Sequence, residues 1–275
     1  MAVQVPYDMR SFGPDTTAGM AVQLLVLEVL CRAIGLDTAG WLTGVLFAVV
    51  TWAVLTVALH RSWSGPFGPA NRVTLARAIL VGCVAALVAD SFAHRVPVPL
   101  LVALATVALI LDAVDGQVAR RTGTATALGA RFDMEVDAFL ILVLSVYVAL
   151  PLGAWVLLIG LMRYAFVAAS WVLPWLRGGL PHSMARKAVA ALQGIALVVA
   201  GAGIVPPAWS LLAVGAALAL LVWSFGRDVA WLWRVREETA AGRGAARGPE
   251  RHPAATSPRG APGRRPAPGR RSAAG

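Results

Sequence analysis

The chain has 275 residues, of which 58% are hydrophobic and only 14% are charged, and its mean hydropathy is +0.71. Soluble domains carry about 25% charged residues, so the composition excludes an ordinary soluble protein and predicts a multi-pass protein of the cell membrane. The formal net charge is +10, but eight arginines and one glutamate between Thr239 and Gly275 supply +7 of it. This Pro/Gly/Ala/Arg-rich segment predicts a disordered tail that lies near anionic lipid or has no function, and no specific nucleic-acid binding.

The apolar runs give the predicted helices in chain order. The first run, 20–35, is short and carries Glu28 and Arg32, which favours a helix lying in the membrane interface over a poor span. Seven further runs are long enough to cross a bilayer, so the predicted fold is an all-α membrane helix bundle. They cover residues 41–59, 73–90, 97–118, 129–150, 153–174, 185–204 and 207–226.

The loops between these runs predict the orientation of the bundle. Alternate connections are rich in arginine, whereas the connections between them carry little charge. Because positively charged loops stay in the cytoplasm, the arginine-rich side should be cytoplasmic. The N-terminus then lies outside if only the run at 41–59 crosses before the run at 73. The basic residues of that side are His60, Arg61, Arg72, Arg120, Arg121, Arg131, Arg177, Arg186 and Lys187.

Four aspartates lie on two helices at the predicted cytoplasmic face. Residues three and four apart share one face of a helix, and both aspartate sets follow this spacing. A short polar turn joins the two helices, so they should be antiparallel neighbours whose polar stripes face each other. The stripes are Asp112, Asp115, Gly116 and Ala119 on the first helix and Thr126, Gly129, Asp133 and Asp137 on the second, with Arg120 at the rim.

The clustered carboxylates need compensation. One acidic side chain within a membrane costs about 2.5–3.5 kcal/mol on insertion scales, and clustering adds repulsion. Few bases are near in sequence: Arg120, Arg121 and Arg131, with Lys187 farther away. Oxygen ligands favour hard cations, so we predict two divalent ions, Mg²⁺ or Mn²⁺. An ion-coupled transporter, in which the carboxylates carry the ion, is the main alternative.

The motif that these residues form resembles the signature of the CDP-alcohol phosphotransferase family. It reads Asp112-x-x-Asp115-Gly116-x-x-Ala119-Arg120, eight residues, then Gly129-x-x-x-Asp133-x-x-x-Asp137. All eight fixed positions are present at the family's spacing. The resemblance implies a six-helix membrane core, here with an extra N-terminal span, usually in a homodimer. The expected domains are an N-terminal extension with the interfacial helix and one span at 1–64, the family domain at 65–236, and the disordered cytoplasmic tail at 237–275.

The resemblance also implies roles for individual residues. Asp112, Asp115 and Asp133 would bind the two divalent ions, and Asp137 would lie with them as the catalytic base. A further element, Asn71-x-x-Thr74-x-x-Arg77, is similar to one that lines the nucleotide side in the family. The residues expected to hold the cytidine diphosphate of the donor are therefore Asn71, Thr74, Arg77, Gly116, Ala119, Arg120, Thr126 and Gly129.

The expected activity is transfer of a phosphatidyl-type group from CDP-diacylglycerol to an alcohol, with release of CMP, in phospholipid biosynthesis. Arg163 lies inside an apolar run, where a cation is costly, and other basic residues begin the run at 185. These cations favour an anionic acceptor such as glycerol 3-phosphate or another phosphorylated polyol, although serine or an existing headgroup stays open. A catalytically silent scaffold is a further alternative. The candidate acceptor residues are Arg131, Arg163, Ser183, Arg186 and Lys187.

Overall fold

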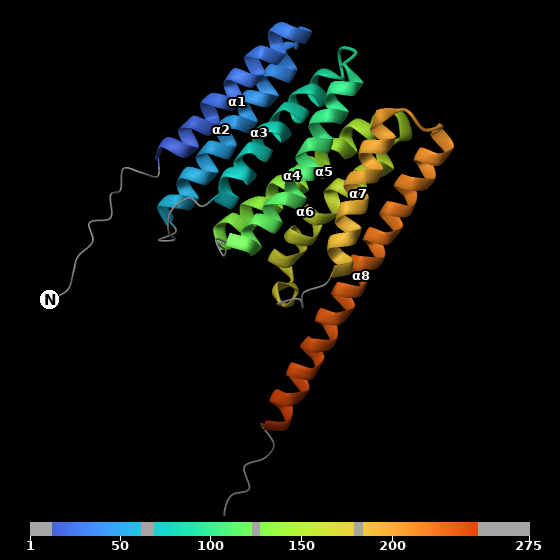
Figure 1. The fold of residues 1–275 in the computed structure, drawn as a ribbon. Coiled ribbons are helices and arrows are strands. Elements are labelled where there is room, and N and C mark those ends of the chain that lie inside the picture. The colour runs from blue at the N-terminus through green and yellow to red at the C-terminus, as the bar shows by residue number, and fades with distance from the viewer. Residues whose placement is uncertain (1–12, 62–68, 123–126, 179–183, 247–275) are drawn as a thin grey trace, which may run out of the picture. The chain divides into compact units, whose positions relative to one another are not determined.

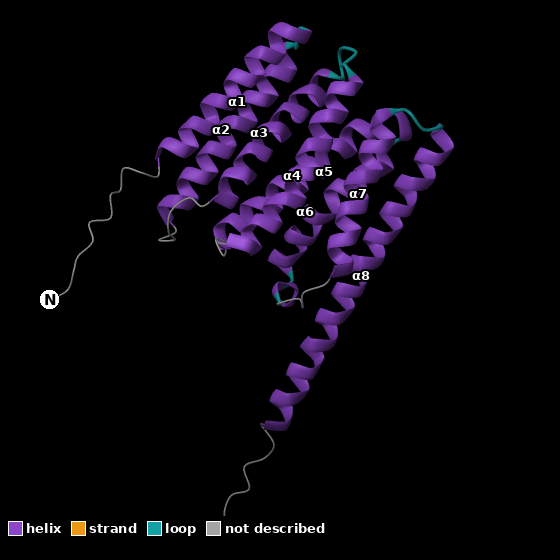
Figure 2. Cartoon of the chain, viewed as in Figure 1, coloured by secondary structure: helices purple, strands orange, loops and turns teal. Residues whose placement is uncertain are grey.

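The computed structural model describes residues 13–61, 69–122, 127–178 and 184–246, and within them every regular element is a helix (Figures 1 and 2). Most connections are short, so helices consecutive in the chain run antiparallel. The predicted all-α bundle is confirmed. The elements are α1 (Gly13–Ile34), α2 (Thr38–Arg61), α3 (Pro69–Asp90), α4 (Val98–Thr122), α5 (Ala127–Leu152), the 3₁₀ turn η1 (Ala154–Val156), α6 (Leu157–Val172), the 3₁₀ turn η2 (Pro174–Arg177), α7 (Met184–Ala202) and α8 (Pro207–Ala246).

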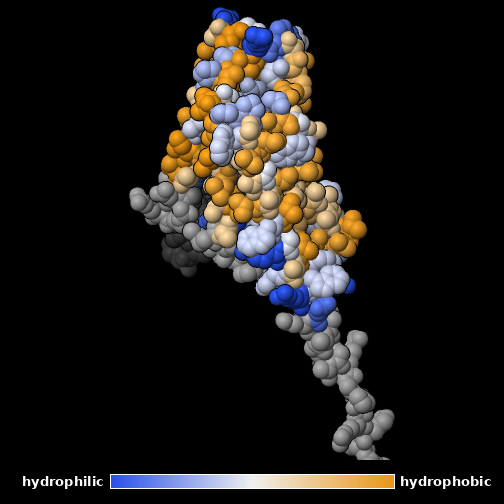
Figure 3. All heavy atoms as spheres, turned by 90° about the vertical axis from the view of Figure 1, so that its right-hand side faces the viewer, coloured by the Kyte–Doolittle hydropathy of each residue, from blue (hydrophilic) through white to orange (hydrophobic). Residues whose placement is uncertain are grey.

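Seven of the described helices are long and apolar enough to cross a membrane, and α4 adds the shorter apolar stretch Val98–Val114. On the face that Figure 3 shows, hydrophobic residues predominate over the described helices. Exposed apolar side chains of this kind are favourable only in a hydrocarbon environment. The chain is therefore a multi-pass membrane protein.

The first helix differs from the interfacial helix that the sequence favoured. α1 satisfies the length and composition of a span, and it packs lengthwise against α2 and α3 (Figure 1). The two charged residues of its apolar stretch Thr17–Ile34 explain the difference, because Arg32 donates to Glu28 at 2.8 Å one turn away. The two charges thus compensate each other. Two candidate spans, α1 and α2, therefore precede α3, so α1 and α3 begin at the same end of the bundle (Figure 1).

The last helix also extends beyond its predicted end. α8 continues to Ala246, so residues 237–246, expected to belong to a disordered tail, are helical. Alanine has the highest helix propensity, and extending an existing helix needs no new nucleus. By its contacts the chain divides into the compact units Met1–Trp233 and Arg234–Gly275. Residues 247–275 lie outside the described part.

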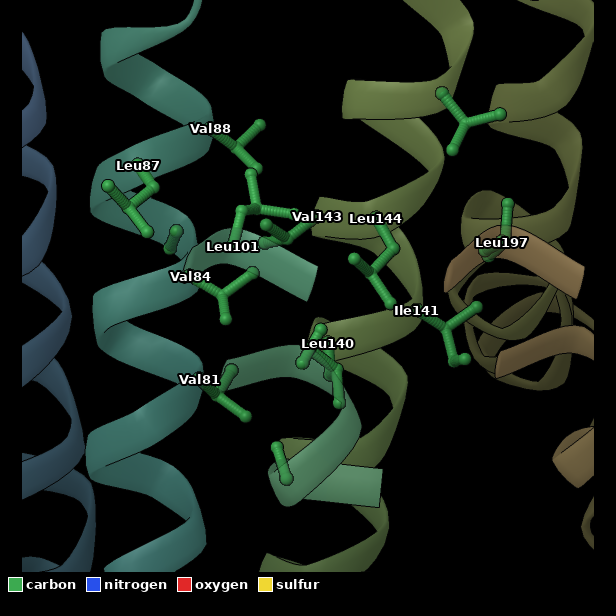
Figure 4. Packing of buried hydrophobic residues seen from close by; sticks show 14 of the residues in the cluster. Val81, Val84, Leu87, Val88, Leu101, Leu140, Ile141, Val143, Leu144 and Leu197 are labelled. Atoms are coloured by element: carbon green, nitrogen blue, oxygen red, sulfur yellow. The ribbon is translucent and has the colours of Figure 1, made fainter. Parts of the chain in front are cut away.

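α3 is the central helix of the first unit, and it packs against α1, α2, α4 and α5. Its stretch Arg72–Asp90 is 67% buried, more than any other candidate span. Small residues permit this close packing: a Cβ atom on Gly82 would lie 2.0 Å from Gln23 Nε2 of α1 and 2.8 Å from Phe47 of α2. Figure 4 shows valines and leucines of α3 facing those of α5, with Leu101 of α4 beside them.

α4 and α5 pack far more extensively on α3 than on each other, and α7 covers both from the other side. The expectation that α4 and α5 face each other directly is therefore only partly met. Their signature-bearing ends do converge, but α3 contributes a side chain between them.

Candidate active site

Arg77 of α3 joins the two aspartate-bearing helices. Its side chain is 1% exposed, and its Nη1 donates to Asp112 Oδ1 of α4. Its Nη2 donates to Asp133 Oδ1 of α5 at 2.5 Å and to the Asp133 backbone carbonyl at 2.8 Å. A planar guanidinium can hold two carboxylates at once on its separate Nη1 and Nη2 groups, in a fixed geometry that a lysine ammonium lacks. One buried side chain thus fixes the distance between the two stripes.

Asp137 belongs to the same site. It lies one helical turn after Asp133 on α5, so both carboxylates share one face. It is close enough to interact electrostatically with Asp112, Asp133 and Arg77, and also with Arg163 of α6. Three of the four predicted carboxylates therefore form one cluster.

The residues expected on the donor side are only partly described. Thr74 is buried one turn before Arg77, and Gly129 lies one turn before Asp133. Both therefore border the cluster. The donor candidates Asn71, Gly116, Ala119 and Arg120 and the metal candidate Asp115 lie on described helices, but nothing is described beyond their backbone. The donor candidate Thr126 and the acceptor candidate Ser183 lie outside the described residues.

The carboxylate oxygens of the cluster are suitable ligands for the predicted divalent ions. The three described carboxylates against one guanidinium leave a formal charge of −2. Asp112 and Asp133 are 39% and 33% exposed, so the cluster is open to an entering ion. All-oxygen ligands and excess negative charge are what Mg²⁺ and Mn²⁺ require.

A second group of potential ligands lies at the other end of α3. Asp90 Oδ1 accepts the backbone N–H of Asp37 at 3.0 Å and lies 3.5 Å from His94 Nδ1. From Arg77 to Asp90 is 13 residues, or about 20 Å along a helix. This group contains no signature aspartate, and its buried carboxylate already accepts the first N–H before α2. We therefore do not assign the predicted ions to it.

The candidate acceptor residues divide into two sets. Arg163 Nη2 of α6 pairs with Glu135 Oε1 of α5 at 2.5 Å, and Arg163 is also close enough to act electrostatically on Asp137. Lys187 of α7 is close enough to act electrostatically on Asp112. Both cations therefore act electrostatically on carboxylates of the cluster.

Arg186 and Arg131 are placed differently. Arg186 Nη1 pairs with Asp228 Oδ2 of α8 at 3.2 Å, and Asp228 also lies 3.6 Å from Arg227. Arg131 is exposed on the first turns of α5. Arg186 and Lys187 are neighbours at the start of α7, yet Arg186 contacts α8 whereas Lys187 acts electrostatically on Asp112 of α4.

Two features of the site were not anticipated from the sequence. Arg77 was expected beside the nucleotide, and it lies between two of the expected metal ligands instead. The Asn-x-x-Thr-x-x-Arg spacing did mark it as a site residue. Glu135 was not singled out, although a carboxylate at the start of an apolar run is the same signal that identified the aspartates.

A comparison with family models matches residues 67–224 to the CDP-alcohol phosphatidyltransferase family. The match covers more than half of the chain and contains the eight signature positions, Arg77 and the candidate acceptor residues. Comparisons with curated proteins and with solved structures found no match. Phosphatidyl transfer from a CDP-alcohol, a reaction of phospholipid synthesis, is the activity of this family. The chain, with its arginine-bridged carboxylates at one end of an all-helical membrane bundle, belongs to the CDP-alcohol phosphatidyltransferase family.

Proposed function

We propose that the protein transfers the phosphatidyl group of CDP-diacylglycerol to the hydroxyl of a phosphorylated polyol, glycerol 3-phosphate first among them, and releases CMP. The observation that carries the proposal is the Arg77 bridge between Asp112 and Asp133, with Asp137 beside it. A purely structural role would not explain several carboxylates gathered where each costs free energy. The extensive apolar surface of the spans suits a lipid donor.

The metal and donor sites follow from this cluster. Asp112, Asp115, Asp133 and Asp137 would hold two divalent ions, Mg²⁺ or Mn²⁺, which when bound neutralise charge on the diphosphate. Arg77 holds Asp112 and Asp133 at a fixed separation, and its positive charge offsets the repulsion between the two carboxylates. Thr74 and Gly129 border the carboxylates, and Gly129 has no side chain to obstruct a nucleotide. With Asn71, Gly116, Ala119, Arg120 and Thr126 they form the proposed donor site.

Asp137 is the proposed general base. The acceptor hydroxyl must lose a proton as its oxygen attacks phosphorus, and a carboxylate beside the donor can accept it. The new bond joins the acceptor oxygen to the phosphorus that carries diacylglycerol. The bond between this phosphorus and the CMP oxygen breaks, and CMP leaves with the bonding electrons.

Arg163 and Lys187 are the proposed contacts for the acceptor's phosphate. Both act electrostatically on carboxylates of the cluster, from α6 and α7 respectively. Arg163 Nε is buried without a hydrogen-bond partner among the described residues, so this guanidinium has donor capacity beyond its pair with Glu135. Orphaned buried donors cost free energy, which favours a bound anion here. Arg131, Ser183 and Arg186 are secondary candidates for the same role.

The protein is proposed to act as a homodimer in the cell membrane, with the site facing the cytoplasm. The support for this orientation is the arginine-rich loops on the signature side.

The test is CMP release from CDP-diacylglycerol by the purified full-length protein with Mg²⁺ or Mn²⁺. The acceptor panel is glycerol 3-phosphate, inositol phosphate, serine, inositol and glycerol. We expect release only with divalent metal and an acceptor, and fastest release with a phosphorylated polyol. A preference for serine or inositol would overturn the acceptor assignment and leave the reaction class intact. Absence of release with every acceptor, from protein that binds the donor, would overturn the proposed activity.

A further inference from the structure

A cavity of about 880 Å³ opens at the end of the bundle away from the signature. It lies among the α3–α4 connection, the ends of α5 and α7 and the start of α8, all within the first compact unit. Val98 at the start of α4 borders it, whereas Asp112 lies 14 residues farther along that helix, or about 21 Å away. Its volume is in the range of small-ligand sites. The proposed transferase reaction gives it no role.

The walls of the cavity are mostly apolar. Leu150 and Leu152 of α5 face Val205 and Pro207 at the α7–α8 connection. Gly201 of α7 lets an aromatic wall form, because a Cβ atom there would lie 3.3 Å from the ring of Tyr147. Walls of this kind accommodate hydrocarbon, and they would hold the tail of an amphiphile.

Charge at the cavity is positive. Arg95 is exposed on the lining and makes no ion pair or hydrogen bond within the described part of the chain. His94, also on the lining, lies 3.5 Å from Asp90, and Asp90 in turn accepts the N–H of Asp37. No aspartate or glutamate is among the lining residues. Arg95 is therefore the cation available to a ligand.

Helix dipoles add little to this charge. The N-terminal ends of α4 and α8 border the cavity and would attract an anion. The C-terminal ends of α3, α5 and α7 also border it and would repel an anion. These contributions largely cancel. The attraction for an anion thus rests on Arg95.

The surroundings place this end of the bundle at a bilayer interface. Trp209 at the start of α8 is 65% exposed, and Phe92 in the α3–α4 connection is 64% exposed. Tryptophan is enriched at the level of the lipid headgroups. The phosphate of a phospholipid would therefore be at the depth of Arg95, and its acyl chains at the depth of the apolar walls.

We propose that this cavity binds an anionic phospholipid of the adjacent leaflet, with its phosphate on Arg95 and part of an acyl chain against α5, α7 and α8. The site is separate from the transfer site and takes a resident lipid, not the reacting donor. Because it ties together the ends of four helices, the bound lipid joins α8 to the helices that carry the carboxylates.

The test uses the full-length protein in liposomes that contain phosphatidylglycerol with a photoreactive acyl chain. After illumination, labelled peptides are mapped by mass spectrometry. We expect labelling at residues 147–152 and 200–207. Arg95→Gln should lower it about fivefold, the change expected for one cation near an anionic lipid surface. Gly201→Leu, which fills the cavity, should lower it without removing charge. Arg32→Gln, which removes a cation outside the cavity lining, should leave it unchanged.

Two further probes identify the ligand. Photoreactive diacylglycerol, which lacks the phosphate, should label these residues much less. A large excess of inorganic phosphate should not compete, since free phosphate cannot use the apolar walls. Any one of three results would overturn the proposal. They are equal labelling by diacylglycerol, full competition by phosphate, and unchanged labelling of both Arg95→Gln and Gly201→Leu. Photolabelling does not require turnover, so its result is independent of the result of the transferase assay.

Discussion

Replacement of Arg77 by glutamine tests the electrostatic arrangement of the site. The guanidinium is 1% exposed and is bonded to both Asp112 and Asp133. Removing one partner of a buried ion pair costs about 3–5 kcal/mol, because the remaining charge is left uncompensated. Here the two carboxylates are 39% and 33% exposed, so water stabilises them in part and the lower figure, about 3 kcal/mol, applies. For a chain of this size that corresponds to a fall in Tm of about 6–12 °C.

Divalent metal should reduce this loss. An ion that binds only the folded protein stabilises it by about 2.7 kcal/mol at one hundred times its Kd. In Arg77→Gln the cluster has one positive charge fewer, so its stability should depend on the ion more than that of the parent protein. The assay is thermal unfolding in detergent, with chelator and with saturating Mg²⁺. The parent protein should show a small difference between the two conditions, and Arg77→Gln a large one.

Two variants control this experiment. Arg77→Lys keeps the charge but cannot hold both carboxylates with a planar fork, so its Tm should be intermediate. Arg32→Gln removes a cation from an exposed pair with Glu28 and should change stability by less than about 1 kcal/mol. If Arg77→Gln unfolds at the parent temperature in chelator, the bridge does not hold the two helices and the description of the site is wrong.

Three more predictions follow from the same contacts. Asp137→Asn should lower CMP release by about 10²–10⁴-fold while CDP-diacylglycerol still binds, the loss typical of a general base; substantial remaining turnover would exclude that role. Arg163→Gln should raise KM for glycerol 3-phosphate about tenfold or more and leave KM for the donor unchanged, measured in initial rates; equal changes in both would point to a general disturbance of the site. Gly160→Ala should destabilise the bundle by about 1–3 kcal/mol, because its Cβ atom would lie 2.5 Å from the Leu142 backbone. Gly215→Ala, whose Cβ atom would have nothing within 4 Å, should not destabilise it. Thermal unfolding of the two variants, measured side by side, checks this, and an equal fall in Tm would contradict it.

Hydropathy and charge spacing predict most of the fold because both signals are local. Apolar runs of span length identify seven of the helices within a few residues, apart from the C-terminal end of α8, and the arginine-rich loops indicate a common side. The signals fail where charges compensate each other in the structure. Glu28 and Arg32 made the first run resemble an interfacial helix, but on α1 they form a pair one turn apart. The helical extension of α8 to Ala246 depends on the helix that precedes it, which composition alone does not convey.

The aspartate cluster was predictable for the same reason. Spacing of three and four residues fixes which side chains share a helix face, whatever the tertiary structure. The contacts between helices were not predictable in this way. Arg77 meets Asp112 and Asp133 across 35 and 56 residues, and it does so because α3 packs against both α4 and α5. Periodicity within one helix carries no information on which helix lies beside it.

The acceptor residues show the same limit. A cation within an apolar run signals function or compensation, and the sequence could not decide between them for Arg163. In the structure it pairs with Glu135, 28 residues away, and also acts on Asp137. The pair with Glu135 and the effect on Asp137 both depend on the packing of α5 against α6, which the sequence does not specify.

The destination of the donor's lipid-bound phosphorus tests the central claim most directly. CDP-diacylglycerol labelled at that phosphorus is incubated with the purified protein, Mg²⁺ and glycerol 3-phosphate, and CMP and labelled lipids are quantified together. We predict one labelled phosphatidyl product per CMP. In this product the labelled phosphorus is bonded both to diacylglycerol and to the acceptor oxygen. Label recovered as phosphatidic acid, which would mean hydrolysis, or CMP formed at the same rate without acceptor, would contradict direct transfer at the bridged carboxylates.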